Sequence, residues 1–434
     1  MALIHAQRFD ANGHRPDPKG QIFRNGKDER DLTDIKIIMS SVDTVRQLYE
    51  SKIKPSIISE IEPLISTSRS KTHIFTVSGN QFILAGGGAS QYQYRLQNNE
   101  LGIIVFIKSS NIKAENYGSH IKIECSPTIL LRRSPRYIQD LMDSIASELS
   151  EGEIRHRGVA IHLALDIQGW SPDRNFSNDL FCRSPSRVQR DGISNAEFSV
   201  NEISVNYGDC QSLTFGTPTS IQMCGYNKTK QMKKVDKTEF FVAAWNGEFP
   251  IFKTTGSYDE KLPVQRLEHR FSHKILSQFH DGLHNDSIPC DSGLPSLKNY
   301  ADASYYLDRL WRYAMLQFKY LRTKQRFHLE WDKFIEDACF TCNENSINDD
   351  FEMKRVIKKQ GVDNSKNVAA ALGHIISISA RNRCGANAVL RLLRNSCIWN
   401  DVLRYFRDKG FRKGDMKEWF ADALIKRRML GMAA

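Results

Sequence analysis

The sequence has 434 residues, a length that favours two domains, or three at most. Its 61 Lys and Arg residues outnumber its 50 Asp and Glu residues, which gives a formal net charge of +11 and favours polyanionic partners, although many proteins that bind no nucleic acid are also basic. There is no signal-peptide segment, no apolar window as long as a membrane span, and no disulfide framework among the nine irregularly spaced cysteines, so we expect a cytoplasmic protein without a membrane partner.

The first part of the chain predicts an α+β fold. Residues 1–30 are rich in Gly, Asp, Asn, Arg and Pro without periodicity, which is typical of a flexible arm. A short strand at 35–40 is followed by apolar residues at helical spacing to about residue 65, with Ser41 or Asp43 placed to cap this helix. Five β-branched and aromatic runs between 73 and 127 then predict an antiparallel meander.

The second part continues this pattern and then changes. A helix begins at Ser134-Pro135, and a strand follows at 157–170. A polar stretch at 171–195 predicts a long surface loop, and further strands are expected at 202–208, in a hairpin over 211–229 and at 263–272.

Beyond a turn-rich segment at 280–296 the periodicity is entirely helical. We therefore expect three parts: a flexible N-terminal arm (1–30), an α+β antiparallel-sheet domain (31–285), and an all-α basic domain (295–434) that binds DNA or forms oligomers.

Two strands carry candidate metal ligands. Period-two alternation places His162 and Asp166 on one face, with the small Ala164 between them. Carboxylate and imidazole ligands suit the divalent cations used in phosphoryl chemistry, such as Mg²⁺ or Mn²⁺, although a solvent-facing polar side of a strand gives the same pattern. Glu268 is a candidate third ligand, but its Arg-x-Glu-x-Arg setting is also typical of an ion-pair ladder, and His269 would replace it in a shifted register.

Tyr226 and Lys228 are expected on one face of the strand that ends the 211–229 hairpin. A tyrosine hydroxyl beside a cation and a lysine can attack a phosphodiester and hold the phosphate covalently. In the alternative, Tyr226 packs its ring over the sheet and Lys228 is merely exposed. Tyr207, just before the hairpin, is a second candidate nucleophile.

The helical part contains a candidate DNA-binding pair of helices within residues 367–395. Four arginines would line a basic face of this pair: Arg381, Arg383, Arg391 and Arg394. Helical hairpins with solvated arginines are also common in proteins that bind no nucleic acid, and base recognition cannot be inferred from charge.

Three segments together resemble the replication initiation factor family, the Rep-trans type of rolling-circle initiators of plasmids and phages, with its related relaxases. Residues 160–166 (AIHLALD) resemble the family strand motif R-I-D-x-A-x-D, residues 213–230 resemble its T-x-Y-x-G-S-x-x-S hairpin ending in R-x-Y-D-K, and residues 264–271 resemble its R-x-E strand. The similarity covers about residues 31–285, but His162 replaces the first Asp of the strand motif and Phe215 replaces the hairpin Tyr.

This resemblance implies a relaxase-like palm fold, a divalent cation held by His162, Asp166 and Glu268, and a DNA nick made by Tyr226 with Lys228. The implied partners are double-stranded and single-stranded DNA at a replication origin, a host helicase, and a second copy of the chain in a homodimer. Two other functions stay open: a non-catalytic DNA-binding replication regulator with the same fold, and a basic interaction protein that binds no nucleic acid.

Overall fold

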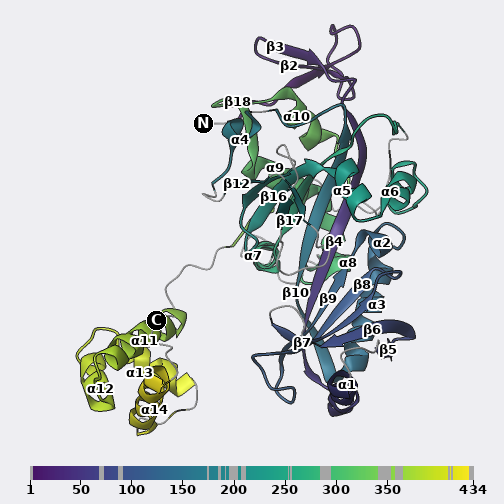
Figure 1. The fold of residues 1–434 in the computed structure, drawn as a ribbon. Helices are drawn as coiled ribbons and strands as arrows, with labels where there is room; N and C mark the ends of the chain where they lie inside the picture. Colours follow the sequence, from purple (N-terminus) through teal and green to yellow (C-terminus); the bar gives the residue numbers. More distant parts are fainter. Residues whose placement is uncertain are drawn as a thin grey trace. The chain divides into compact units, whose positions relative to one another are not determined.

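The computed structural model describes residues 3–67, 73–86, 91–173, 175–183, 187–190, 192–194, 204–206, 212–252, 254, 257–283, 295–340, 353–356, 365–408, 411 and 414–429. The chain forms two compact units, Met1–Val356 and Ile357–Ala434 (Figure 1). The first unit combines a large sheet with helices, and the described part of the second unit is helical, so the α+β prediction with a helical C-terminal region is confirmed.

An eleven-stranded antiparallel sheet organises the first unit, in the order β12-β15-β16-β17-β10-β4-β9-β8-β7-β6-β5. Its two long central strands, β4 (Lys36–Ile53) and β10 (Ser150–Gln168), pair over almost their whole length (Figure 1). The other strands are β5 (His73–Val77), β6 (Asn80–Gly86), β7 (Tyr92–Asn98), β8 (Ile103–Ser109), β9 (Gly118–Cys125), β12 (Arg187–Arg190), β15 (Ser212–Gly216), β16 (Ile221–Asn227) and β17 (Gln265–Phe271).

Several predicted elements are confirmed. The meander from residue 73 forms β5 to β9, and the predicted hairpin forms β15 and β16. Helix α3 (Pro135–Leu149) begins as predicted: Pro135 is its first residue, and the Ser134 side chain accepts a hydrogen bond from the Tyr137 amide. The segment predicted as a long surface loop instead contains α4 (Phe176–Asp179) and short strands such as β11 (Leu180–Phe181) and β12.

The predicted helix after residue 40 is wrong in its first part. Strand β4 continues to Ile53, and helix α1 (Pro55–Thr67) begins only at a proline. Because β4 is hydrogen-bonded to β10 on one edge and to β9 on the other, the long-range pairing outweighs the local helical spacing. Asp43 is consequently a strand residue and not a helix cap.

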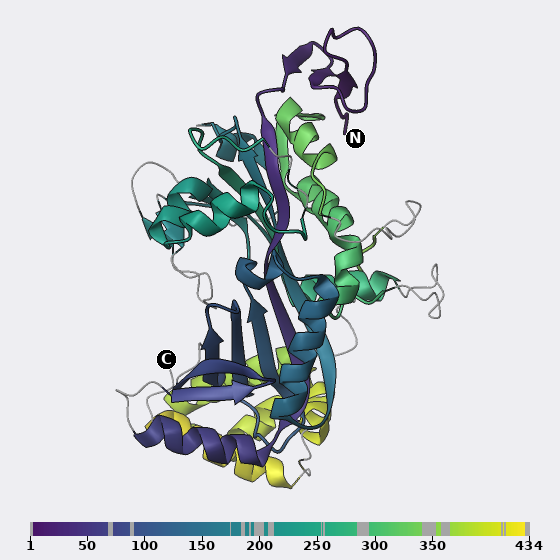
Figure 2. The same ribbon diagram turned by 90° about the vertical axis from the view of Figure 1, so that its right-hand side faces the viewer.

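The two faces of the sheet differ. Ile161, Leu163 and Leu165 of β10 are fully buried on the face covered by α3 and by α9 (Leu307–Gln317). In Figure 2 the blue helix α3 and the green helices lie on this side, and the teal helices α5 (Lys228–Lys234) and α6 (Thr238–Trp245) lie on the other. The opposite face, beside α6, carries the polar residues of β10.

The N-terminal residues differ from the predicted flexible arm. Residues 3–31 contain a three-stranded sheet of β1 (Gln7–Phe9), β2 (Ile22–Asn25) and β3 (Asp28–Asp31). Phe23 is fully buried, and the Ala6 amide donates a hydrogen bond to Asp332 in α10 (Leu329–Glu336). Long-range contacts therefore order a segment whose composition is typical of disorder.

The boundary of the first unit also lies further along the chain than the predicted 285–295. Trp311 and Trp331 are fully buried in the core of the sheet unit. Periodicity predicts helices here but does not show which core they join, and it misses two short strands at 319–323 and 326–327. The remaining elements between residues 126 and 330 are α2 (Pro127–Leu130), β13 (Gly192–Ser194), β14 (Ser204–Asn206), α7 (His273–Leu283), α8 (Tyr300–Ala303), η1 (Ser304–Tyr306), β18 (Lys319–Thr323) and β19 (Arg326–Phe327).

The second unit has a hydrophobic core of its own, which includes Leu372, Leu393 and Phe420. Its helices are α11 (Ser365–Arg381), α12 (Ala386–Arg394), α13 (Trp399–Asp408) and α14 (Asp415–Met429). Throughout the part of the chain that the structure describes, no helix combines the length and apolarity needed to cross a membrane.

Candidate metal and tyrosine site

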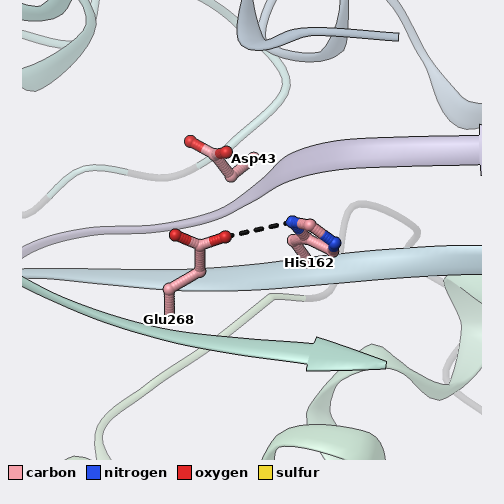
Figure 3. A group of neighbouring side chains, drawn as sticks. All are labelled: Asp43, His162 and Glu268. Atoms are coloured by element: carbon pink, nitrogen blue, oxygen red, sulfur yellow. Dashed lines mark ion pairs between the residues drawn. The ribbon is translucent and has the colours of Figure 1, made fainter. Parts of the chain in front are cut away.

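Asp43, His162 and Glu268 come from three neighbouring strands and meet on the polar face of the sheet (Figure 3). Each offers one ligand atom, and these atoms all lie within 4.8 Å of one another. His162 Nδ1 lies 3.0 Å from Glu268 Oε1. His162 and Glu268 are buried, and Asp43 is partly buried.

The strand register explains why His162 and Glu268 meet. Glu268 of β17 pairs with Ala164 of β10, and Arg270 pairs with His162. Directly paired residues of antiparallel strands share a face, so His162 is the diagonal neighbour of Glu268. The small side chain of Ala164 leaves the space between them open.

Asp43 joins the group through a β-bulge. Between His162 and Leu163 the partner on β4 steps from Thr44 to Val42, which leaves Asp43 as the extra residue. A bulge commonly re-aims a side chain, and here it turns a carboxylate towards His162 and Glu268. The sequence holds one signal for it: Val42 and Val45 are both fully buried on the apolar face, although strict alternation cannot place residues three apart on one face.

Glu268 is the most heavily contacted member of the group. Its Oε1 lies 2.8 Å from Arg270 Nε, and its Oε2 accepts a hydrogen bond from the Tyr226 hydroxyl at 3.2 Å. Burial by itself would raise the pKa of Glu268, but Arg270 and His162 hold it well below its usual range. Glu268 is therefore ionised at neutral pH.

His162 has a pKa lowered from its ordinary value, chiefly by burial, in spite of its contact with Glu268. Its imidazole is therefore neutral at neutral pH, which is the form that binds metal ions. His269, the alternative ligand in a shifted register, lies on the opposite face, where its ring contacts Trp311 and Phe318 of the core.

Asp166, predicted as a metal ligand, is not in this group. Both of its oxygens accept hydrogen bonds from Arg266, at 2.6 and 2.8 Å, and the Trp245 indole donates a third at 2.8 Å. The prediction that Asp166 lies on the same face as His162 is confirmed, but Arg266 stands directly opposite Asp166 in the register and binds its carboxylate. Since Arg266 also contacts Asp43, Asp166 holds the arginine that orients one of the three candidate ligands.

Tyr226 lies beside the candidate metal group, as the hydrogen bond to Glu268 shows. Burial and the charge of Glu268 raise the pKa of Tyr226 well above its ordinary value, so the phenol is protonated at neutral pH. Its strand partner on β17 is Arg266, which in turn pairs with Asp166 of β10, so Tyr226 is a diagonal neighbour of Glu268.

Lys228 does not project from the strand with Tyr226, because β16 ends at Asn227 and Lys228 begins helix α5. Its Nζ donates a hydrogen bond to Gln231 at 2.8 Å and lies 3.8 Å from the centroid of the Phe241 ring. The second candidate nucleophile, Tyr207, lies outside the described residues.

The charged groups immediately around these three residues fit a bound cation. Three carboxylates, those of Asp43, Asp166 and Glu268, contact two guanidinium groups, those of Arg266 and Arg270, which leaves one formal negative charge. Two carboxylates and one imidazole within reach of one point are ligands that divalent cations accept.

In the second unit, the four arginines of the predicted basic face are all exposed: Arg381, Arg383, Arg391 and Arg394. Helices α11 and α12 are joined by only four residues, 382–385, of which Arg383 has a positive φ of 55°. The prediction of two helices joined by a short turn is confirmed, and its role in DNA binding stays a prediction.

Comparison with known proteins adds one relative. The chain is 31% identical over 431 residues to a protein of Pseudomonas phage Pf1, the uncharacterized protein ORF430, and the match covers 95% of both chains. No protein-family model matches the chain.

Proposed function

The chain belongs to the family of ORF430 of Pseudomonas phage Pf1. For this phage-related chain we propose the function of a rolling-circle replication initiator that nicks one DNA strand through Tyr226. The observation that carries the proposal is the hydrogen bond from the Tyr226 hydroxyl to Glu268, a member of the candidate metal group. A hydroxyl nucleophile, a carboxylate that can take its proton and a cation site are thus adjacent.

The proposed reaction is a transesterification. Glu268 accepts the phenolic proton as the Tyr226 oxygen forms a bond to phosphorus, and the bond from phosphorus to the 3′ oxygen breaks. The 3′ oxygen takes up a proton and leaves as a 3′-hydroxyl that can prime synthesis, while the 5′-phosphate stays bound to Tyr226. A divalent cation such as Mg²⁺ or Mn²⁺, when bound, supplies charge stabilisation for the phosphate oxygens.

The electrostatics of the free site support a requirement for a cation in the proposed reaction. The raised pKa of Tyr226 keeps the phenol protonated, because burial and the negative charge of Glu268 both disfavour a phenolate. Positive charge near Glu268 weakens that repulsion. We therefore expect Tyr226 to cut DNA when a divalent cation is bound and not to cut it without one.

The helical unit supplies the proposed origin-binding surface. Arg391 and Arg394 are exposed at the end of α12, the second helix of the short-turn pair. Exposed arginines of this kind contact phosphates and fix the position of a helix on a duplex. Origin DNA would then be held by the second unit and cut by the first.

A nicking assay tests the proposal. Wild-type protein should convert the supercoiled DNA of its own replicon to the open circle in Mg²⁺ or Mn²⁺ and should not do so with a chelator. Glu268→Gln should reduce the rate about 10²-fold or more, because it removes the proton acceptor and a ligand. The matched control Glu153→Gln changes an exposed glutamate on β10 and should nick normally.

One observation favours a second candidate function, a non-catalytic DNA-binding replication regulator. The Tyr226 phenol is hydrogen-bonded and has a strongly raised pKa, which is also what a structural tyrosine shows. Under this alternative the protein binds its DNA in the presence of Mg²⁺ and of Mn²⁺ but does not cut the supercoiled form with either cation. That result would reject the nicking proposal.

A further inference from the structure

A cavity of about 230 Å³ adjoins the candidate metal group on the same face of the sheet. His162 and Arg270, which contact Glu268, also line this cavity. Its other charged walls are Arg46 of β4 and Lys122 of β9. Three cationic side chains from three different strands therefore border one cavity that His162 also lines.

The acidic groups behind these walls only partly neutralise them. Glu124, which is fully buried, lies 2.6 Å from Lys122 Nζ and 3.5 Å from Arg46 Nε. One carboxylate thus faces two cations, while Arg270 is matched by Glu268. The cavity keeps one formal positive charge in a setting where water screens poorly, so an anion is the ligand that its charges favour.

The positions of the cations are fixed by the surrounding structure. Lys122 is 9% exposed, and its Nζ lies 4.2 Å from the centroid of the Phe106 ring and 5.7 Å from that of Tyr92, which also lines the cavity. Burial lowers the pKa of Lys122, although Glu124 opposes this shift. Holding Lys122 beside Arg46 is electrostatically unfavourable, and an anion bound between the two side chains would offset this free-energy cost.

The volume of the cavity limits the size of the ligand. It is several times the roughly 30 Å³ that a water molecule occupies in the liquid, and it is smaller than the pockets of about 300–1,000 Å³ that hold drug-sized ligands. A phosphate group with part of its sugar fits this size, whereas a whole dinucleotide does not.

We propose that this cavity binds a phosphate group of single-stranded DNA, the neighbour of the phosphate that is cut at the candidate metal group. The proposal rests on the proposed function. His162 and Arg270 border both the candidate metal group and the cavity, so neighbouring phosphates of one strand can occupy the two places. Arg46 and Lys122 hold the non-scissile phosphate and so fix the register of the strand against Tyr226. The cavity is a positioning subsite, and Arg46 and Lys122 do not take part in the bond changes.

Binding of a fluorescent (dT)₈ oligonucleotide to the full chain in a chelator, at several salt concentrations, tests the proposal. Lys122→Gln removes one cation from the cavity, and the remaining pair of Glu124 and Arg46 then leaves no net positive charge there. It should bind (dT)₈ roughly tenfold more weakly, because it cannot form one charge-assisted hydrogen bond to the phosphate. The slope of log affinity against log salt should fall by about 0.7, the value for one phosphate neutralised on a single strand.

Lys52→Gln is the matched control, since Lys52 is exposed on β4 and lies outside the cavity lining, and it should leave affinity and slope unchanged. Arg46→Gln is the second variant, used if thermal unfolding shows that Lys122→Gln is not folded, and it should lower the slope in the same way. Wild-type affinity and slope in a folded cavity variant would overturn the proposal.

Failure of the subsite and failure of the nicking function give different results. Tyr226→Phe should abolish nicking and bind (dT)₈ as tightly as wild type, because the phenol is outside the cavity lining. If wild type does not nick but the cavity variants still bind weakly with a reduced slope, the nicking function is rejected and the phosphate subsite stands. If wild type nicks and the cavity variants bind normally, the subsite alone is rejected.

Discussion

Glu268 connects the parts of the candidate site at the scale of single residues. It contacts His162, Arg270 and Tyr226, and its pKa is held well below its usual range by the charges around it. Asp43 completes the candidate ligand group from β4, the strand that pairs with the other edge of β10 on the same sheet face. In the proposed function, metal binding and proton acceptance would both depend on the Glu268 carboxylate, and metal affinity would also depend on the bulged Asp43.

The first residue-scale prediction concerns metal affinity. Asp43→Asn replaces a candidate carboxylate ligand by an amide and should weaken Mn²⁺ binding at least about tenfold, as measured by calorimetric titration of the metal-free protein. Asp28→Asn, an exposed aspartate on β3, should bind Mn²⁺ as wild type does. Equal Mn²⁺ affinity of the Asp43 variant and wild type would remove Asp43 from the site.

The second residue-scale prediction separates Asp166 from the ligands. Asp166→Ala leaves Arg266 buried without its main partner, and removal of one member of a buried ion pair costs about 3–5 kcal/mol. We expect urea unfolding to show a decrease in stability of this size. A variant with wild-type stability that no longer binds Mn²⁺ would instead identify Asp166 as a ligand.

At the scale of elements, the sequence predicts faces better than it predicts partners. Alternation on β10 correctly places His162 and Asp166 on the polar face, and Glu268 of β17 lies on that face beside them. Alternation does not give the register, which sets Arg266 opposite Asp166 and so occupies its carboxylate. Asp43 could not be predicted as a ligand because the helical spacing after residue 40 hides a strand whose bulge is fixed by its pairing with β10.

His269 on β17 provides an element-scale prediction of pH dependence. Burial against α9 lowers the pKa of His269 to about 3. The ring is therefore neutral in the folded chain at pH values below about 6.5 where it is protonated in the unfolded chain. The stabilising contribution of the neutral ring is therefore complete above pH 6.5 and is lost as the pH falls towards 3, by about 1.4 kcal/mol per pH unit.

Urea unfolding in the presence of a chelator, repeated between pH 7 and pH 5, measures how steeply the free energy of unfolding changes with pH. His269→Asn removes the titrating group and should reduce the slope by about 1.4 kcal/mol per pH unit below pH 6.5, whatever its effect on stability at pH 7. Exposed His14→Asn is the control and should keep the wild-type slope. If both variants kept that slope, His269 would not be the group that resists protonation.

At the scale of the whole molecule, the chain joins a sheet unit that carries the candidate chemistry to a helical unit with exposed arginines. The sequence predicts both types of unit, but it places the boundary too early because helical periodicity does not reveal that α9 and α10 pack on the sheet. This division predicts that duplex binding and strand cleavage can be weakened separately.

Duplex binding tests this division of labour. The double variant Arg391→Ala with Arg394→Ala should reduce the salt slope of duplex affinity by up to about 0.9 for each phosphate that it no longer neutralises. It should cleave a short single-stranded substrate at the wild-type rate. Lys417→Ala, an exposed change on α14, is the control with an unaltered slope. An unaltered slope in the double variant as well would place duplex binding elsewhere.

The identity of the residue that becomes attached to DNA tests the central claim most directly. Protein incubated with the supercoiled DNA of its own replicon and Mn²⁺ should yield, after nuclease and protease digestion, a peptide that carries a 5′-phosphonucleotide on Tyr226, and Tyr226→Phe should yield none. An adduct on Tyr207 or on any other residue, or a nick without an adduct, would contradict the account.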